Sequence, residues 1–203
     1  MGTTDSTASD GGVTEIRWHA RGGQGAKTAS TFLAESAVDA GLFAQGFPEY
    51  GPERMGAPMR AYNRIARKPL RVNAPVKHPG IVILLDETLL DTVDIGEGAT
   101  ENTVFLLNTA SSDVGALQAK LRAKLGDSAR VFVVNADKIA IETIGRAIPN
   151  TPMVGAMLRA TSVLPLETVI EGLRHKLGKK FPPKIVEGNV AAVRRAFEEV
   201  TEL

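Results

Sequence analysis

The sequence predicts an α/β fold: a mostly parallel sheet flanked by helices, with a helical C-terminal extension. Two observations predict it. Apolar runs without alternation recur at residues 81–86, 103–107 and 130–134, and such runs are typical of strands that are covered on both faces. Amphipathic segments with helical spacing lie between and after these runs, and beyond Pro149 the pattern changes to helices alone.

The chain opens with a strand, a glycine-rich turn and a helix. Residues 14–18 alternate polar and apolar side chains and lead into the glycines of residues 22–25. From Ala26 to Ala40 apolar side chains recur every three or four residues, and Gly41 stands where a helix C-cap is expected. Order is expected to begin at Val13, directly before this strand.

Two further strands are predicted at residues 42–47 and 59–65. The second alternates polar and apolar side chains, which suits a strand with one face exposed to water. Residues 48–58 between them are rich in Gly and Pro and are predicted to form a stiff loop.

Helices complete the pattern. Residues 114–125, closed by Gly126, form an amphipathic helix between two buried strands, and residues 137–147 form another. The predicted C-terminal helices are 153–163, 166–177 and 189–200, with residues 181–184 as a rigid connector. Strands that alternate with helices in this way form a Rossmann-like sheet with right-handed crossovers.

Composition divides the chain of 203 residues into three parts. Residues 1–12 form a polar leader that buries too little apolar surface to become ordered. Residues 13–180 form the main domain, since this length suits one core. Residues 181–203 form the C-terminal helical extension.

Charge and residue usage exclude several classes of function. The 24 basic and 23 acidic residues give a net charge of +1, which argues against a nucleic-acid binder. The chain has no cysteine, which excludes disulfides, a cysteine nucleophile and an iron–sulfur cluster held by its own thiolates. Neither an apolar run of about 20 residues nor a secretory signal is visible, so we expect a cytoplasmic protein that does not bind membranes.

Acid–base and metal chemistry are poorly supported by this chain. His19, His78 and His175 lie far apart, and there is no Gly-x-Ser-x-Gly motif. No His, Asp and Glu cluster has metal-ligand spacing. We therefore predict neither a catalytic residue nor a metal site.

The first candidate site is the glycine-rich turn at residues 19–25. Its glycines allow a tight turn, and the free amides of the following helix face any anion, with phosphate or pyrophosphate as the natural ligand. Its spacing is neither that of dinucleotide-binding folds nor that of the P-loop. Two interpretations stand: an anion-binding loop, or a tight strand-to-helix turn without a ligand.

The second candidate is the loop at residues 48–58. Glu49, Tyr50, Glu53 and Arg54 are held among prolines and glycines, as in a loop that fixes polar groups for recognition. The alternative is an ion pair between Glu and Arg that only pins the loop.

Two segments carry a resemblance to a known family. Residues 15–26 (EIRWHARGGQGA) and 47–58 (FPEYGPERMGAP) closely resemble the gamma subunit of pyruvate and related 2-oxoacid:ferredoxin oxidoreductases. Residues 86–90 (DETLL) and 134–136 (VNA) are also similar to that family. On this resemblance, residues 13–180 are identified with its gamma domain.

The resemblance implies a complex that converts a 2-oxoacid and coenzyme A into acyl-coenzyme A and carbon dioxide, with ferredoxin as electron acceptor. Thiamine diphosphate, Mg²⁺ and iron–sulfur clusters are then expected on partner chains: the thiamine-binding alpha and beta subunits and a ferredoxin-like delta subunit. The lack of cysteine in this chain fits that division. In the family, the choice among 2-oxoacids rests mainly on the thiamine-binding subunits.

The resemblance also implies that the gamma domain contacts coenzyme A. The residues expected to bind it are Arg21, Gly22, Gly23, Gln24, Gly25 and Ala26, with further contacts from Arg54 and Asn150. Ala20 stands where the commoner family motif has Gly, so its methyl either crowds a phosphate or lies away from it. Arg54 has an alternative role in a subunit interface, and the whole chain has the alternative of a purely structural subunit with no ligand contact.

Overall fold

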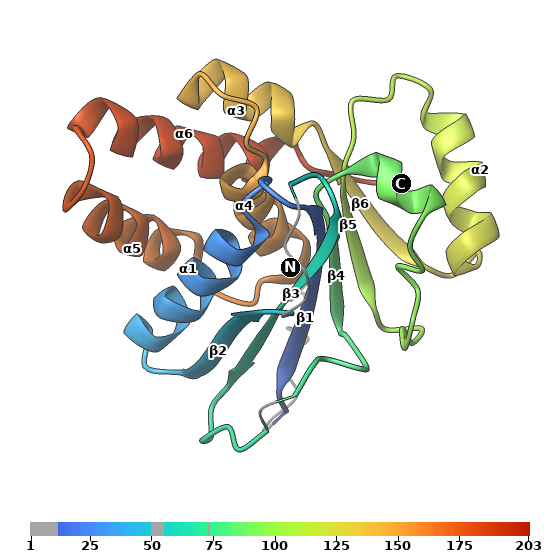
Figure 1. The fold of residues 1–203 in the computed structure, drawn as a ribbon, viewed down its shortest axis with the longest axis horizontal. Helices are drawn as coiled ribbons and strands as arrows, with labels where there is room; N and C mark the ends of the chain where they lie inside the picture. The colour runs from blue at the N-terminus through green and yellow to red at the C-terminus, as the bar shows by residue number, and fades with distance from the viewer. Residues whose placement is uncertain (1–11, 50–54, 73) are drawn as a thin grey trace, which may run out of the picture.

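A seven-stranded mixed sheet organises the protein, in the order β2-β3-β1-β4-β5-β6-β7 (Figure 1). The computed structural model describes residues 12–49, 55–72 and 74–203. The strands are β1 (Thr14–Arg21), β2 (Phe43–Pro48), β3 (Pro58–Ala66), β4 (Ile81–Leu84), β5 (Val104–Asn108), β6 (Arg130–Val134) and β7 (Thr201–Glu202). The central strands β1, β4, β5 and β6 pair in parallel, whereas β3 joins β1, β2 joins β3 and β7 joins β6 in antiparallel pairs. The predicted α/β fold with a mostly parallel core is confirmed.

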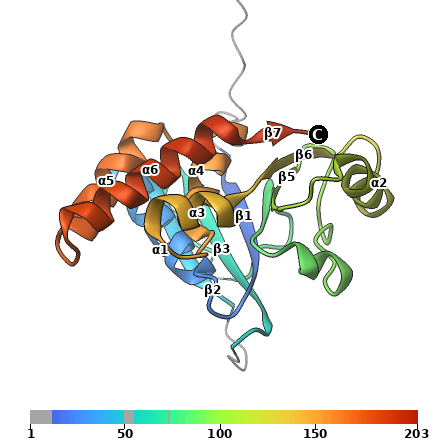
Figure 2. The ribbon, with the colours of Figure 1, turned by 90° about the horizontal axis from the view of Figure 1, so that it is seen from above.

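Helices cover both faces of the sheet (Figures 1 and 2). The helices are α1 (Ala26–Asp39), α2 (Val114–Leu125), α3 (Ala136–Ile144), α4 (Asn150–Thr161), α5 (Leu166–Gly178) and α6 (Pro183–Glu199), with a 3-10 helix, η1 (Glu87–Asp91). Side chains of α1 and of α3 to α6 pack on one face, and those of α2 and η1 pack on the other. Each face therefore has its own apolar core.

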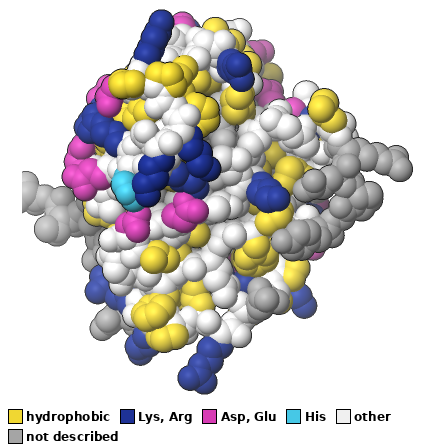
Figure 3. All heavy atoms as spheres, turned by 60° about the vertical axis from the view of Figure 1, so that its left-hand side comes forward, with side chains coloured by type: hydrophobic (Ala, Val, Ile, Leu, Met, Phe, Trp, Pro, Cys, Tyr) yellow, Lys and Arg dark blue, Asp and Glu magenta, His cyan; other side chains and the backbone are white. Residues whose placement is uncertain are grey.

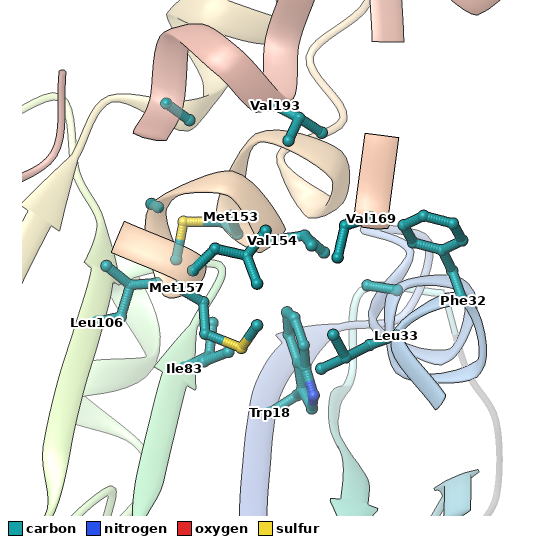
Figure 4. Packing of buried hydrophobic residues seen from close by; sticks show 14 of the residues in the cluster. Trp18, Phe32, Leu33, Ile83, Leu106, Met153, Val154, Met157, Val169 and Val193 are labelled. Atoms are coloured by element: carbon teal, nitrogen blue, oxygen red, sulfur yellow. The ribbon is translucent and has the colours of Figure 1, made fainter. Parts of the chain in front are cut away.

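The larger core fixes the ends of α1 and α4 against β1. Trp18 of β1 is fully buried and lies beside Leu33 of α1 and Met157 of α4 (Figure 4). Its indole Nε1 donates a hydrogen bond of 2.9 Å to Asn63 Oδ1, so the one polar atom of the ring is satisfied. Because replacing a buried Trp by Ala typically costs 3–5 kcal/mol, on the order of half a domain's stability, Trp18 is a main contributor to this core.

Several predicted boundaries were wrong. The predicted helix 189–200 begins at Pro183, because Pro at the first helical position lacks only an amide that would be unpaired there. The connector between α5 and α6 is therefore residues 179–182, and residues 183–184 of the predicted connector belong to α6. Helix α3 ends at Ile144, where Gly145 adopts a φ of 78°. The 3-10 helix η1 and strand β7 were not predicted.

The C-terminal residues pack onto the rest of the fold. Helix α6 contacts α3, α4 and α5, and β7 pairs with β6. A Cβ added at Gly155 of α4 would lie 2.1 Å from the carbonyl oxygen of Val193, so the two helices cross in close contact. The division at residue 181 stays a prediction, and residues 1–11 of the predicted leader lie outside the described residues.

Opposite charges are interleaved on the surface of α5 and α6 (Figure 3). The exposed ion pairs there are Arg174–Glu187 at 3.0 Å, Arg194–Glu167 at 2.8 Å and Arg195–Glu142 at 2.8 Å. Exposed pairs contribute little to stability, so these side chains form a solvated face. Within residues 12–49, 55–72 and 74–203, no helix has both the length and the apolar character needed to cross a bilayer.

Candidate functional site

The chain leaves the sheet in opposite directions at the carboxyl ends of β1 and β4. After β1 it passes through α1 to β2 and β3 on one side, and after β4 it passes to β5 and β6 on the other. Open α/β sheets bind ligands at such a switch point, outside the carboxyl ends of the strands. The glycine loop, defined as residues 21–25, lies at this point between β1 and α1.

The backbone of the glycine loop depends on two glycines. Gly23 has a φ of 100° and Gly25 a φ of 84°, in the left-handed region that other residues rarely adopt. Gly25 is the N-cap of α1, and among the described residues no side chain caps this helix end. The first amides of α1 have no carbonyl partner within the helix, and the helix dipole makes this end positive. Backbone and dipole therefore suit an anionic group.

Four side chains form a hydrogen-bonded cluster beside the glycine loop: Arg21, Gln24, Asp86 and Thr88. Gln24 Nε2 donates to Asp86 Oδ2 at 2.9 Å, and Gln24 Oε1 accepts from the backbone N of Arg21 at 2.8 Å. Arg21 Nε lies 3.1 Å from Asp86 Oδ2, and Arg21 Nη2 donates to Thr88 Oγ1 at 2.8 Å. The side chains of Arg21 and Gln24 thus bind other parts of the protein.

Asp86 is held ionised within this cluster. Burial opposes ionisation, but hydrogen bonds from Thr88 and Gln24 and the charge of Arg21 outweigh it, so the pKa of Asp86 lies below its ordinary value. Its carboxylate is therefore charged at neutral pH.

The end of the loop 48–58 pairs with the glycine loop. The backbone N of Gly22 donates to Ala57 O at 2.9 Å, and the backbone N of Gly56 donates to Gly22 O at 3.2 Å. Arg21 Nη1 also donates to Gly56 O at 3.1 Å. Arg54 lies outside the described residues, as do Tyr50 and Glu53, so the predicted role of Arg54 stays a prediction.

Asn150 reaches the glycine loop from the start of α4. It is buried, and its Nδ2 donates to Gly25 O at 3.3 Å. A Cβ added at Gly25 would lie 2.5 Å from Asn150 Nδ2, so only glycine fits there. The structure thus brings Asn150 together with the predicted residues from Arg21 to Ala26, although 125 residues separate Asn150 from Gly25.

His19 is buried in β1 and is held in its neutral form. Its ring is buried, and its Nε2 accepts a hydrogen bond of 3.0 Å from Arg17 Nε. Burial, together with the charges of Arg17 and Arg60, lowers the pKa of His19 to about 3. The described part of the chain also holds no group of three or more His, Asp or Glu side chains that could bind a metal.

Sequence reasoning assigned no role to Asp86 and Thr88. A usable signal was present, because Asp86 directly follows a buried parallel strand that ends at the same sheet edge as the glycine loop. The two donors that come from the glycine loop could not be read from the sequence, since Gln24 and Asp86 are 62 residues apart.

Comparison with known proteins gives a consistent picture. Residues 15–199 match the family model for pyruvate ferredoxin/flavodoxin oxidoreductase. The chain is similar to the pyruvate synthase subunit PorC of Thermotoga maritima, with 47% identity over 186 residues, 92% of this chain and 94% of that protein. It is 40% identical to the pyruvate/ketoisovalerate oxidoreductases common subunit gamma of Pyrococcus abyssi, over 91% of this chain and 96% of that one.

Two solved structures resemble the fold. The crystal structure of the pyruvate oxidoreductase subunit PORC from Thermotoga maritima has a TM-score of 0.80 and 43% identity, over 94% of this chain and 98% of that one. The 2-oxoglutarate:ferredoxin oxidoreductase from Magnetococcus marinus, solved with 2-oxoglutarate, coenzyme A and succinyl-CoA bound, has a TM-score of 0.68. At 18% identity, over 91% of this chain and 30% of that one, the second likeness concerns the fold alone.

Proposed function

Because this chain belongs to the pyruvate ferredoxin/flavodoxin oxidoreductase family as a gamma subunit, we propose that it helps to bind coenzyme A in the assembled enzyme. The family membership confirms the resemblance predicted from the two sequence motifs. The proposed reaction is the oxidative decarboxylation of pyruvate or a related 2-oxoacid to acyl-coenzyme A and carbon dioxide, with reduction of ferredoxin.

The proposed division of labour is the one that the family resemblance implies, and the lack of cysteine in this chain fits it. Its sequence has no cysteine, so iron–sulfur clusters are assigned to partners, namely the beta subunit and a ferredoxin-like delta subunit. Thiamine diphosphate and Mg²⁺ are assigned to the alpha and beta subunits. The gamma subunit contributes a binding surface and takes no part in bond making.

One observation carries the proposal: α1 begins without a side-chain cap, behind two left-handed glycines, at the switch point of the sheet. A phosphate of coenzyme A fits there, because backbone N–H groups and the positive end of a helix dipole favour an anion. Glycines at positions 22, 23 and 25 keep side chains away from such a ligand. When bound, coenzyme A supplies the thiol that takes up the acyl group.

The remaining predicted contacts have unequal support. Asn150 donates to Gly25 O, and this position at the glycine loop supports an amide contact with the proposed phosphate. Arg21 and Gln24 lie in the loop, but their side chains bind Asp86 and Thr88 and their backbone N–H groups donate within the turn, so a direct contact with the ligand has the least support for these two residues. Arg54 remains a candidate for a charged contact.

The relative from Pyrococcus abyssi supports a role in the shared part of the reaction. That subunit is common to pyruvate and ketoisovalerate oxidoreductases, whose 2-oxoacids differ in their side chains. A subunit used for both substrates suits the co-substrate that both reactions share, and that co-substrate is coenzyme A.

The test compares Gly23→Ala with Gly41→Ala in the assembled complex. Both glycines have positive φ (100° and 81°), and an added Cβ meets nothing within 4 Å at either position, so the backbone strain is matched. We expect Gly23→Ala to raise the KM for coenzyme A roughly tenfold, as the loss of one hydrogen bond to a charged group would, and Gly41→Ala to leave it unchanged.

The alternative is a purely structural subunit whose loop contacts no ligand. It predicts the same KM for coenzyme A in both variants, and that result would overturn the proposal. Dephospho-coenzyme A then identifies the anion: a loss of the Gly23→Ala effect with this analogue assigns the 3′-phosphate to the loop, and a retained effect assigns the pyrophosphate.

A further inference from the structure

We propose that Asp86, together with Thr88, is a positioning residue that holds the glycine loop in the shape that receives coenzyme A. The inference rests on the proposed function. Neither residue is assigned a contact with the ligand; both act through Arg21 and Gln24.

The carboxylate of Asp86 is used completely within the protein. Oδ1 accepts from the backbone N of Thr88 at 2.9 Å and from Thr88 Oγ1 at 2.5 Å. Oδ2 accepts from Gln24 Nε2 at 2.9 Å and lies 3.1 Å from Arg21 Nε. Two donors thus come from its own segment and two from the glycine loop, so Asp86 links β4 to the loop.

The sheet fixes the position of Asp86. Strand β4 pairs with β1 so that Leu84 lies opposite His19, and the backbone N of Leu85 donates to His19 O at 2.9 Å. Asp86 follows one residue later, and its side chain is only 16% exposed. A carboxylate anchored in this way has a fixed position relative to β1 and can hold the more irregular loop beside it.

The charge on Asp86 dictates how the Gln24 amide is oriented. A carboxylate only accepts hydrogen bonds, so Gln24 must turn Nε2 toward Asp86 and Oε1 toward the backbone N of Arg21. The backbone N of Gln24 donates in turn to Arg21 O at 3.1 Å. The turn from Arg21 to Gln24 is therefore closed by two hydrogen bonds, and Asp86 sets the orientation of the side-chain amide that makes one of them.

Arg21 links a third segment to this hydrogen-bonded cluster. Its guanidinium donates to Thr88 Oγ1 and to Gly56 O, and Gly56 pairs with Gly22 through the backbone. Residues 21–25, 55–57 and 86–88 thus form one hydrogen-bonded unit. A loop that is already in its binding shape loses less entropy when the ligand arrives.

Electrostatic repulsion and positioning predict opposite changes in the affinity for coenzyme A when the charge of Asp86 is removed. A carboxylate near the site of an anionic ligand repels it, so loss of the charge alone would tighten the binding of coenzyme A. In Asp86→Asn, however, an amide NH₂ would face the donors of Gln24 and Arg21, and the loop would lose its fixed shape. Positioning therefore predicts weaker binding.

The experiment measures KM values in the assembled complex. We expect Asp86→Asn and Thr88→Val each to raise the KM for coenzyme A roughly tenfold and to leave the KM for the 2-oxoacid within about twofold. Thr88→Ser keeps the hydroxyl and should restore the KM for coenzyme A. Asp91→Asn is the matched charge control, because Asp91 lies in the same 3-10 helix but pairs with Lys120 at 2.9 Å.

The outcomes separate this inference from the proposed function. If Gly23→Ala raises the KM for coenzyme A while Asp86→Asn and Thr88→Val lower it or leave it unchanged, the positioning role is wrong and the loop remains the binding site. If none of the three variants changes it, both proposals fail. A rise in both KM values for Thr88→Val that Thr88→Ser does not reverse would indicate general damage and would also overturn the positioning role.

Discussion

Two strand-to-helix turns at the same edge of the sheet are built in opposite ways. Between β6 and α3, Asn135 caps the helix by accepting from the backbone N of Lys138 at 2.9 Å, and the backbone N of Ala136 donates to Asn108 Oδ1 at 2.9 Å. Between β1 and α1, a glycine loop replaces the capping side chain. The start of α3 is satisfied by the protein itself. Within the described part of the chain, the start of α1 has no capping side chain, so its first amides are left for another acceptor.

The strands that lead into these turns differ as well. Residues 130–134 of β6 are mostly buried and apolar, whereas β1 carries the buried polar side chains of Arg17 and His19 on one face. A buried ionisable group costs stability under conditions that would charge it. We therefore expect the β1–α1 unit to give up stability that the β6–α3 unit retains, as functional sites often do.

The largest expected effect concerns pH and His19. Because the folded-state pKa of about 3 lies below the ordinary value of 6.5, the unfolded chain binds a proton between these values that the folded chain does not. Stability should therefore fall as the pH drops from 6.5 toward 3, by roughly 5 kcal/mol over the whole window. Urea unfolding of the purified chain at pH 7 and pH 5 measures the upper part of this loss.

His19→Gln isolates the effect, since its side-chain oxygen can still accept from Arg17 but does not titrate. The variant should lose less stability than the natural chain between pH 7 and pH 5, and the exposed His78→Gln should behave like the natural chain. Equal losses in all three would contradict the assignment of the acid sensitivity to β1.

The next largest expected effect is a loss of stability on replacing the glycine at the start of α1 or the glycine at the end of α3. Gly25→Ala adds both backbone strain and a Cβ only 2.5 Å from Asn150, and it should lower the free energy of unfolding by about 3 kcal/mol. Gly145→Ala has similar strain at a φ of 78° but open space around the Cβ, and should cost about 1 kcal/mol. Thermal unfolding of both variants gives the difference, which should shrink when Asn150→Ala is added to Gly25→Ala.

The smallest effect concerns the cap that α3 has and α1 lacks. Asn135→Ala removes the hydrogen bond to Lys138 and should cost about 1 kcal/mol in denaturant unfolding. The KM of the assembled complex for coenzyme A should not change, because this helix end is assigned no ligand. A changed KM would mean that the two turns are not as different as their hydrogen bonds indicate.

Local pattern was sufficient for much of the fold. The strand at 130–134 and the helix at 114–125 were predicted with the bounds they have, because apolar runs and helical periodicity are local signals. The start of α6 was missed, because Pro183 is typical both of a connector and of a first helical turn.

The glycine loop was also found from local spacing, but its surroundings were not. The residues that shape it, Asp86 and Thr88, come from another strand, and their contacts depend on the register between β1 and β4. Asn150 was predicted through the family resemblance, since nothing in its own neighbourhood indicates a contact 125 residues away. The sequence thus indicates the candidate loop, and the tertiary structure shows which residues hold its shape.

The contact between Asn150 and Gly25 has a consequence for biosynthesis. Strand β1 and the glycine loop leave the ribosome early, but α4 emerges only after about three quarters of the chain has been translated. A nascent chain can therefore fold its first strands well before this neighbour is available. Prematurely terminated products that end ahead of α4 would carry the loop in an incomplete setting, so full-length synthesis is a condition for a finished site.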